Sequence, residues 1–158
     1  MFDKTFQIVT APKDGTVGNA VEEPVSRRSP GVLHGLSNLV ENAADFAKET
    51  ITVTSEWTDQ MVSIIIEDDG PGFAQNMLDS LGEPYLTSRP LSGRLRKRST
   101  DHARLGLGFF IASTLLERSG AEIHIANRKS PAKGAVVHVV WDRETFEAIG
   151  YKGDSNFG

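Results

Sequence analysis

Apolar residues recur at helical spacing between residues 30 and 49, so they form one stripe along a single predicted helix. Ser29 is suited to cap this helix and Pro30 to occupy its first turn, and the pattern continues to about Glu49. At about 100° per residue, the expected core stripe is centred on Leu36. It comprises Val32, Leu33, Leu36, Val40, Ala43, Ala44 and Ala47.

Shorter stretches rich in β-branched residues predict strands, and a second apolar run predicts another helix that ends at Gly120. A short helix is expected at Gln75–Leu81, whereas residues 82–105 show no periodicity and are typical of a long loop. This order predicts an α+β fold, a two-layer α/β sandwich in which about three helices cover one face of a mixed, mostly antiparallel sheet. The expected strands are Thr5–Val9 and residues 51–57, 61–68, 121–127 and 134–141.

The composition favours one domain with its own core, since the chain has 158 residues of which 39% are hydrophobic. There is no cysteine, which excludes disulfides and thiolate zinc sites. No apolar run is long enough to span a bilayer, and the N-terminus lacks the apolar region of a signal peptide. We expect the domain to occupy residues 1–146 and a flexible tail to occupy residues 147–158.

The net charge of −4 argues against a general nucleic-acid binder, but the charge is distributed unevenly. Six Lys or Arg residues and one acid lie between Arg89 and Arg104, so this segment is strongly basic on an acidic chain. One interpretation is a solvated basic loop, and the other is a loop that attracts phosphate groups.

The predicted first helix carries amides and carboxylates opposite its core stripe, and no cation before Lys48. A solvated helix face is the simple interpretation, although such faces usually carry lysine and arginine as well. A face rich in oxygen and free of cations also suits a hard ion such as Mg²⁺, which binds few protein oxygens beside its phosphate and water ligands. The stripe consists of Asn38, Glu41, Asn42 and Asp45.

Two glycine motifs lie at the ends of predicted elements. In the strand that ends at Asp68, alternation places this aspartate on the core face, where its carboxylate needs a hydrogen-bond donor. Gly70 and Gly72 follow in a turn that permits close backbone approach. Gly106 and Gly108 precede the second long helix, whose free N–H groups can face an anion. Taken alone, each motif is also explained by a tight turn.

Three motifs follow one another along the chain: NLVENAADFA at residues 38–47, DDGPGF at 68–73 and LGLG at 105–108. In this order they resemble the N box and the first two glycine boxes of the ATP-binding catalytic domain of sensor histidine kinases, in the family shared with gyrase, Hsp90 and mismatch-repair ATPases. KGAVVHV, at 133–139, occupies the place of the third glycine segment, and LGEPYLTSR, at 81–89, that of the aromatic F box. The resemblance spans roughly residues 5–142 and is closest to the redox-responsive sensor kinases.

This resemblance implies a Bergerat-type ATP-binding fold with ATP and Mg²⁺ as cofactors. Asn42 would ligate the Mg²⁺, and Asp68 would accept the adenine amino group. Asn38 and Glu41 are the implied catalytic residues, with Glu41 orienting the partner's histidine, and residues 82–105 would form a lid over ATP. The implied nucleotide-binding residues are Asn38, Asn42, Asp45, Phe46, Asp68, Gly70, Gly72, Phe73, Tyr85, Leu105, Gly106, Leu107 and Gly108.

The chain departs from the family pattern at Arg104, where the second glycine box usually has a further glycine. An arginine there either alters the backbone of the lid or adds a charge for the phosphates. None of the four histidines is followed by an acid, so we expect no phosphoacceptor histidine and no dimerisation domain in this chain.

The family implies partners outside the chain. These are the histidine-bearing dimerisation domain of a dimeric parent sensor kinase and, indirectly, a response regulator. The isolated domain would be a monomer, and its location would be cytoplasmic, as part of an inner-membrane sensor. Two alternatives stay open: an anti-sigma-factor type of serine kinase that binds a protein partner, and a degenerate nucleotide-sensing module without catalysis.

Overall fold

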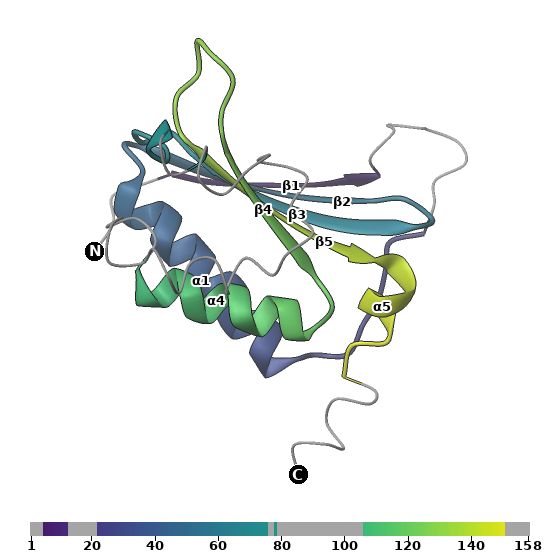
Figure 1. The fold of residues 1–158 in the computed structure, drawn as a ribbon. Helices are drawn as coiled ribbons and strands as arrows, with labels where there is room; N and C mark the ends of the chain where they lie inside the picture. Colours follow the sequence, from purple (N-terminus) through teal and green to yellow (C-terminus); the bar gives the residue numbers. More distant parts are fainter. Residues whose placement is uncertain (1–4, 13–21, 76–77, 79–105, 151–158) are drawn as a thin grey trace.

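The computed structural model describes residues 5–12, 22–75, 78 and 106–150, which form a layer of helices on a five-stranded sheet (Figure 1). The strand order is β1-β2-β3-β5-β4. The first two strands pair in parallel and all other neighbours are antiparallel, as predicted for a mixed, mostly antiparallel sheet. The elements are β1 (Thr5–Pro12), α1 (Pro30–Phe46), β2 (Thr50–Trp57), β3 (Met61–Asp68), α4 (Leu107–Arg118), β4 (Glu122–Asn127), β5 (Ala135–Asp142) and α5 (Arg143–Glu147).

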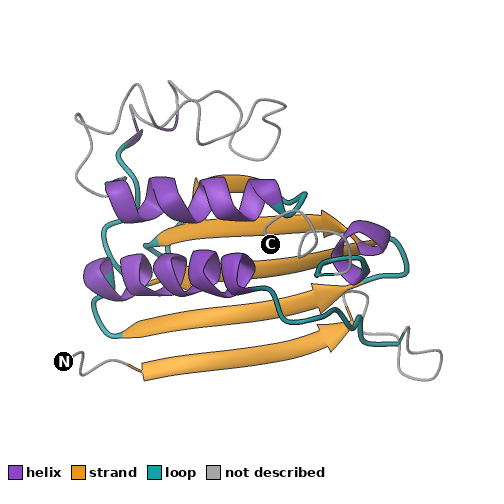
Figure 2. Ribbon diagram, turned by 90° about the horizontal axis from the view of Figure 1, so that it is seen from below, coloured by secondary structure: helices purple, strands orange, loops and turns teal. Residues whose placement is uncertain are grey.

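Helices α1 and α4 lie side by side over one face of the sheet (Figure 2). They approach closely at Gly35, where an added Cβ would lie 2.9 Å from Leu116 Cγ and 3.2 Å from the carbonyl oxygen of Ala112. The predicted two-layer α+β sandwich is therefore confirmed. Within the described part of the chain, no helix has both the length and the apolar character that a membrane crossing requires.

The core lies between the sheet and the two long helices, and on α1 the buried stripe is rotated from the predicted one. Leu39 is 1% exposed, whereas Leu33, which was predicted to be in the core, is 44% exposed. The two residues lie about 60° from Leu36 on opposite sides of the helix. Leu39 is one turn after Gly35, on the side that α4 covers, so contact with α4 buries Leu39 and leaves Leu33 open. The placement of Leu33 in the core was wrong.

The first helix has the predicted start and an earlier end. The Ser29 hydroxyl accepts a hydrogen bond from the N–H of Val32 at 3.3 Å, which confirms the cap. The helix ends at Phe46 rather than near Glu49. Beyond Phe46 the N–H groups of Lys48 and Glu49 donate to the Asp69 carboxylate, at 2.7 and 2.9 Å, instead of continuing the helix.

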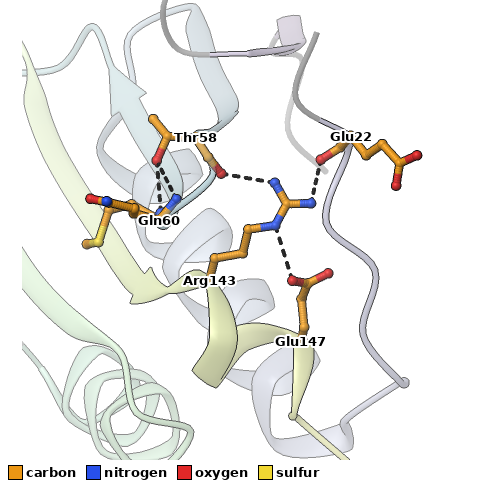
Figure 3. A network of polar contacts seen from close by, with 6 residues as sticks. Glu22, Thr58, Gln60, Arg143 and Glu147 are labelled. Carbon is orange, nitrogen blue, oxygen red and sulfur yellow. Dashed lines mark hydrogen bonds and ion pairs between the residues drawn. The ribbon is translucent and has the colours of Figure 1, made fainter. Parts of the chain in front are cut away.

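Helix α5 begins where no helix was predicted, and contacts with distant residues hold it. Phe146 packs edge-on against Trp141, with ring centroids 5.3 Å apart. The guanidinium group of Arg143 contacts the Glu147 carboxylate and the carbonyl oxygens of Thr58 and Glu22 (Figure 3). Arg143 therefore joins α5 to the β2–β3 hairpin and to the segment that precedes α1. Residues 151–158 of the predicted tail lie outside the described residues.

Candidate functional site

The two long helices run antiparallel, which brings the C-terminal half of α1 next to the start of α4 (Figure 1). Cβ atoms built at two glycines near the start of α1 would lie close to residues in the later part of α4. One at Gly31 would lie 3.8 Å from Leu115, and one at Gly35 would approach Leu116 and the carbonyl oxygen of Ala112. Asn42 is seven residues after Gly35, which is two helical turns further along the same face. Its amide therefore lies on the side of α1 that faces the first turn of α4.

The predicted polar stripe of α1 divides into two pairs. Asn38 and Asn42 are half-buried, whereas Glu41 and Asp45 are exposed. The amides thus lie toward α4 and the carboxylates lie toward solvent. Among the residues that the structure describes, no three His, Cys, Asp or Glu side chains gather as metal ligands. A metal ion at this stripe would depend on amide oxygen and on ligands supplied by another molecule.

Asp68 ends β3 with its side chain in the core, as alternation predicted. The residue is 2% exposed. Its Oδ1 accepts hydrogen bonds from the N–H of Gly70, at 2.9 Å, and from the N–H of Ala135 at the start of β5, at 3.2 Å. These donors offset part of the cost of burying the carboxylate and fix its orientation.

Asp69 points away from the core and holds the junction between α1 and β2. Burial raises the pKa of this carboxyl, but hydrogen bonds from the main-chain N–H groups of Glu49, Thr50 and Lys48 outweigh that effect and hold the pKa below its usual value. No role was predicted for Asp69. The sequence offered only its alternation to the outer face of the strand, because the residues that it contacts lie 20 and 21 positions away.

The glycine turn after β3 touches the end of α1 and the start of β5. An added Cβ at Gly70 would lie 2.1 Å from the carbonyl oxygen of Phe46, and one at Gly134 would lie 1.7 Å from the carbonyl oxygen of Asp68. Both contacts are to main-chain atoms, which cannot rotate away. Phe46 and Asp68 are thereby brought together, although they come from separate motifs.

Asn127, the last residue of β4, holds the other end of the same turn and was not predicted. Its Oδ1 accepts from the N–H of Phe73 at 2.7 Å, and its Nδ2 donates to the carbonyl oxygen of Phe73 at 2.8 Å. The Phe73 ring packs edge-on against Phe109 of α4, with centroids 6.4 Å apart. Alternation could have predicted only the inward direction of Asn127, which follows Ile123 and Ile125 on the inner face of its strand, and not its contact with Phe73.

The start of α4 has the features of an open helix N-terminus. Gly106 is the N-cap, and the described residues supply no side-chain hydrogen bond that caps the helix. Leu107 is 71% exposed. A Cβ at Gly108 would meet no described atom within 4 Å. Tyr85, Leu105, Arg104 and the predicted lid of residues 82–105 lie outside the described residues, as does most of the helix predicted at Gln75–Leu81.

Residues 28–145 match the family model described as histidine kinase-, DNA gyrase B-, and HSP90-like ATPase. The sensor histidine kinase RegB of Cereibacter sphaeroides is 40% identical over 133 residues, which cover 78% of this chain and 29% of RegB. The chain thus spans less than a third of the length of that relative. The sensor protein ChvG of Agrobacterium fabrum is 26% identical over 138 residues, covering 80% of this chain and 22% of ChvG.

Solved structures agree with the fold. The mycobacterial sensor histidine kinase MprB superposes with a TM-score of 0.59 at 19% identity, covering 89% of this chain and 82% of that structure. At this identity the likeness concerns the fold alone. The family model covers well over half of the chain, so the chain belongs to the family of histidine kinase-, DNA gyrase B-, and HSP90-like ATPases. The predicted family resemblance is confirmed.

Proposed function

We propose that this domain binds ATP with Mg²⁺ and donates the γ-phosphoryl group to a histidine on a separate dimerisation domain, in two-component signal transduction. The observation that carries the proposal is the buried Asp68 carboxylate, fixed by two main-chain donors where the glycine turn meets the end of α1. Family membership supports ATP as the ligand. The similarity to RegB, which is named as a sensor histidine kinase, supports histidine as the acceptor.

The adenine end of the proposed site is the turn around Asp68. A carboxylate that is buried and held by two N–H groups is rigid, so it can accept a hydrogen bond from the exocyclic amino group of adenine at little entropic cost. Gly70, beside it, has no side chain, and the main chain of Phe46 takes up that space, so the end of α1 packs directly against the proposed adenine end.

The phosphate end is the start of α4. The first N–H groups of a helix lack intrahelical partners, and the helix dipole favours negative charge there. No described atom lies within 4 Å of a Cβ built at Gly108, so the described residues leave an anion room to approach these groups. Asn42, on the face of α1 that meets α4, offers an amide oxygen, which is a hard donor of the type that Mg²⁺ accepts. When bound, Mg²⁺ would neutralise phosphate charge during transfer.

The acceptor in this proposal is a histidine outside the chain. None of the four histidines here is followed by an acid, and His124 lies buried in the sheet beside Glu122, 3.5 Å away. A dimerisation domain of a parent sensor kinase would supply the histidine, and a response regulator would receive the phosphoryl group next. Exposed Glu41, one turn from Asp45 on the outer side of α1, is the proposed group that orients that histidine.

Calorimetric titration with ATP and Mg²⁺ tests the binding half of the proposal. We expect the wild-type chain to bind with a Kd of about 1 mM or tighter. Asp68→Asn keeps an oxygen for the Gly70 and Ala135 donors but replaces the second oxygen by a donor, so ATP affinity should fall at least about tenfold. Asp59→Asn, at an exposed hairpin position, is the matched control and should bind like the wild type.

The metal and transfer halves need separate readouts. Asn42→Ala should remove the gain in ATP affinity that Mg²⁺ gives the wild type, while affinity measured without Mg²⁺ stays the same.

For transfer, the domain is mixed with the dimerisation domain of Cereibacter sphaeroides RegB and γ-labelled ATP. Label that is lost in acid and kept in base marks phosphohistidine. Label stable in acid would mark a serine kinase and overturn the histidine assignment.

A further inference from the structure

The last strand pair before the β4–β5 loop contacts the glycine turn at both of its ends. On β5, the N–H of Ala135 donates to Asp68, where the turn begins. On β4, Asn127 bonds to Phe73, where the turn ends, and Asn127 and Ala135 are cross-strand partners. We propose that Asn127 is a positioning residue of the nucleotide site, an inference that rests on the proposed function. It acts by fixing the main chain of Phe73 and need not touch the nucleotide.

The contact requires a carboxamide. One side-chain group must accept from the N–H of Phe73, at 2.7 Å, and donate to its carbonyl oxygen, at 2.8 Å. An asparagine side chain offers both atoms on one planar group. The two hydrogen bonds resemble the N–H and C=O pair that a residue exchanges with its partner on a neighbouring strand. Asn127 therefore holds the end of the turn as a neighbouring strand would.

The contact between Asn127 and Phe73 gives a second physical reason for a glycine at position 72. A Cβ at Gly72 would lie 2.6 Å from Asn127 Oδ1 and 3.0 Å from Asn127 Cγ, so the carboxamide occupies the space that a side chain would need. Gly72 also has a φ of +81°, which disfavours other residues. Access for adenine was the reason expected for this glycine, whereas the nearest atoms to its missing side chain belong to Asn127.

Phe73 packs against the first turn of α4, so the position of Phe73 affects the position of that turn. Phe73 is 3% exposed, and its ring forms a T-shaped contact with the ring of Phe109, which is fully buried. Phe109 is the third residue of α4, directly after Gly108. Because close-packed rings transmit displacement, loosening the main chain at Phe73 also loosens the first turn of α4. Asn127 thus sets the proposed adenine and phosphate ends of the site relative to each other.

The primary test is ADP affinity by calorimetry. Asn127→Ala removes both hydrogen bonds and should raise the Kd for ADP about tenfold. Thr58→Ala is the matched control: its hydroxyl accepts from the N–H groups of Gln60 and Met61, at 3.0 and 2.9 Å, in the hairpin at the opposite end of β3. It removes the same number of main-chain contacts and should leave the Kd within about twofold of the wild type.

A second variant, Asn127→Asp, separates a role in hydrogen bonding from a role in filling space, because only the first should make the Kd depend on pH. In Asn127→Asp the ionised carboxylate can accept from Phe73 but cannot donate, whereas the protonated carboxyl can do both. The ratio of variant to wild-type Kd should therefore fall from about tenfold near pH 8 to about twofold near pH 4, where about half of an ordinary aspartate is protonated. The same ratio for Asn127→Ala should stay constant over this range.

The outcomes separate the two proposals. If wild-type protein does not bind ADP or ATP, the proposed function fails and this inference fails with it. If the wild type binds and folded Asn127→Ala binds within twofold of it, only the positioning role is overturned. If Asn127→Ala does not fold, the Asn127→Asp ratio decides: a value that does not change with pH overturns the role, and recovery at low pH supports it.

Discussion

Replacing Gly70 by alanine tests whether the turn and the end of α1 must touch. The new Cβ would lie 2.1 Å from the carbonyl oxygen of Phe46, whereas real Cβ atoms come no closer than 3.0 Å, so the two segments must separate by about 0.9 Å. Neither atom belongs to a flexible side chain. We expect Gly70→Ala to lower the free energy of unfolding by about 3 kcal/mol, at the upper end of overpacking effects.

Thermal unfolding followed by circular dichroism measures this loss. For a domain of this size, about 3 kcal/mol corresponds to a Tm lower by about 6 to 12 °C. Gly108→Ala is the matched control, since its Cβ meets no described atom within 4 Å and lies in a helix. It should leave Tm unchanged or raise it by up to about 4 °C, because alanine favours helix over glycine by up to about 1 kcal/mol.

The two glycine variants should also differ in function. Gly108→Ala puts a methyl group into the space proposed for phosphates, so it should weaken ATP binding while the fold stays intact. Gly70→Ala should weaken binding and stability together. If Gly70→Ala unfolds at the wild-type temperature, the close contact between Gly70 and Phe46 does not exist as described, and the argument for a rigid adenine turn fails.

Two further predictions concern stability. Asp69→Asn should lower the free energy of unfolding by about 1 kcal/mol at neutral pH, allowing for solvent screening. Because the folded-state pKa of Asp69 is lowered, this stabilisation is complete above the unfolded-state pKa near 4 and is lost as pH falls through the lowered value. Urea melts of the two proteins should therefore converge in acid. Leu39→Ala should cost about 2 to 5 kcal/mol and Leu33→Ala less than about 1 kcal/mol; equal losses in urea melts would contradict the rotated stripe.

Local patterns predicted the features that depend on a single element. Alternation along β3 was sufficient to point Asp68 inward, and a cap residue with a following proline located the start of α1. The side of the apolar stripe of α1 that is buried deepest could not be predicted in this way, because periodicity gives only the angles between residues around the helix. Which side of the stripe is buried deepest depends on α4, which lies far along the chain, and so Leu33 was misplaced and Leu39 left out.

Contacts between distant residues were beyond such reasoning. Asn127 and Phe73 are 54 positions apart, and nothing near either residue indicates the other. Helix α5 is five residues long, too short to show a period, and its stability comes from Trp141 and the Arg143 contacts. The early end of α1 likewise depends on Asp69, a residue of a different motif.

The Arg143 contact with Glu22 has a consequence for the order of folding. These residues are 121 positions apart, so their contact closes almost the whole domain into one loop. Such a contact gains little until the sheet between them has formed, because the entropy of closing the loop must first be overcome. The network in Figure 3 should therefore form after the folding transition state. Arg143→Ala should then speed unfolding while leaving the folding rate unchanged, so this cluster governs how long the folded domain survives.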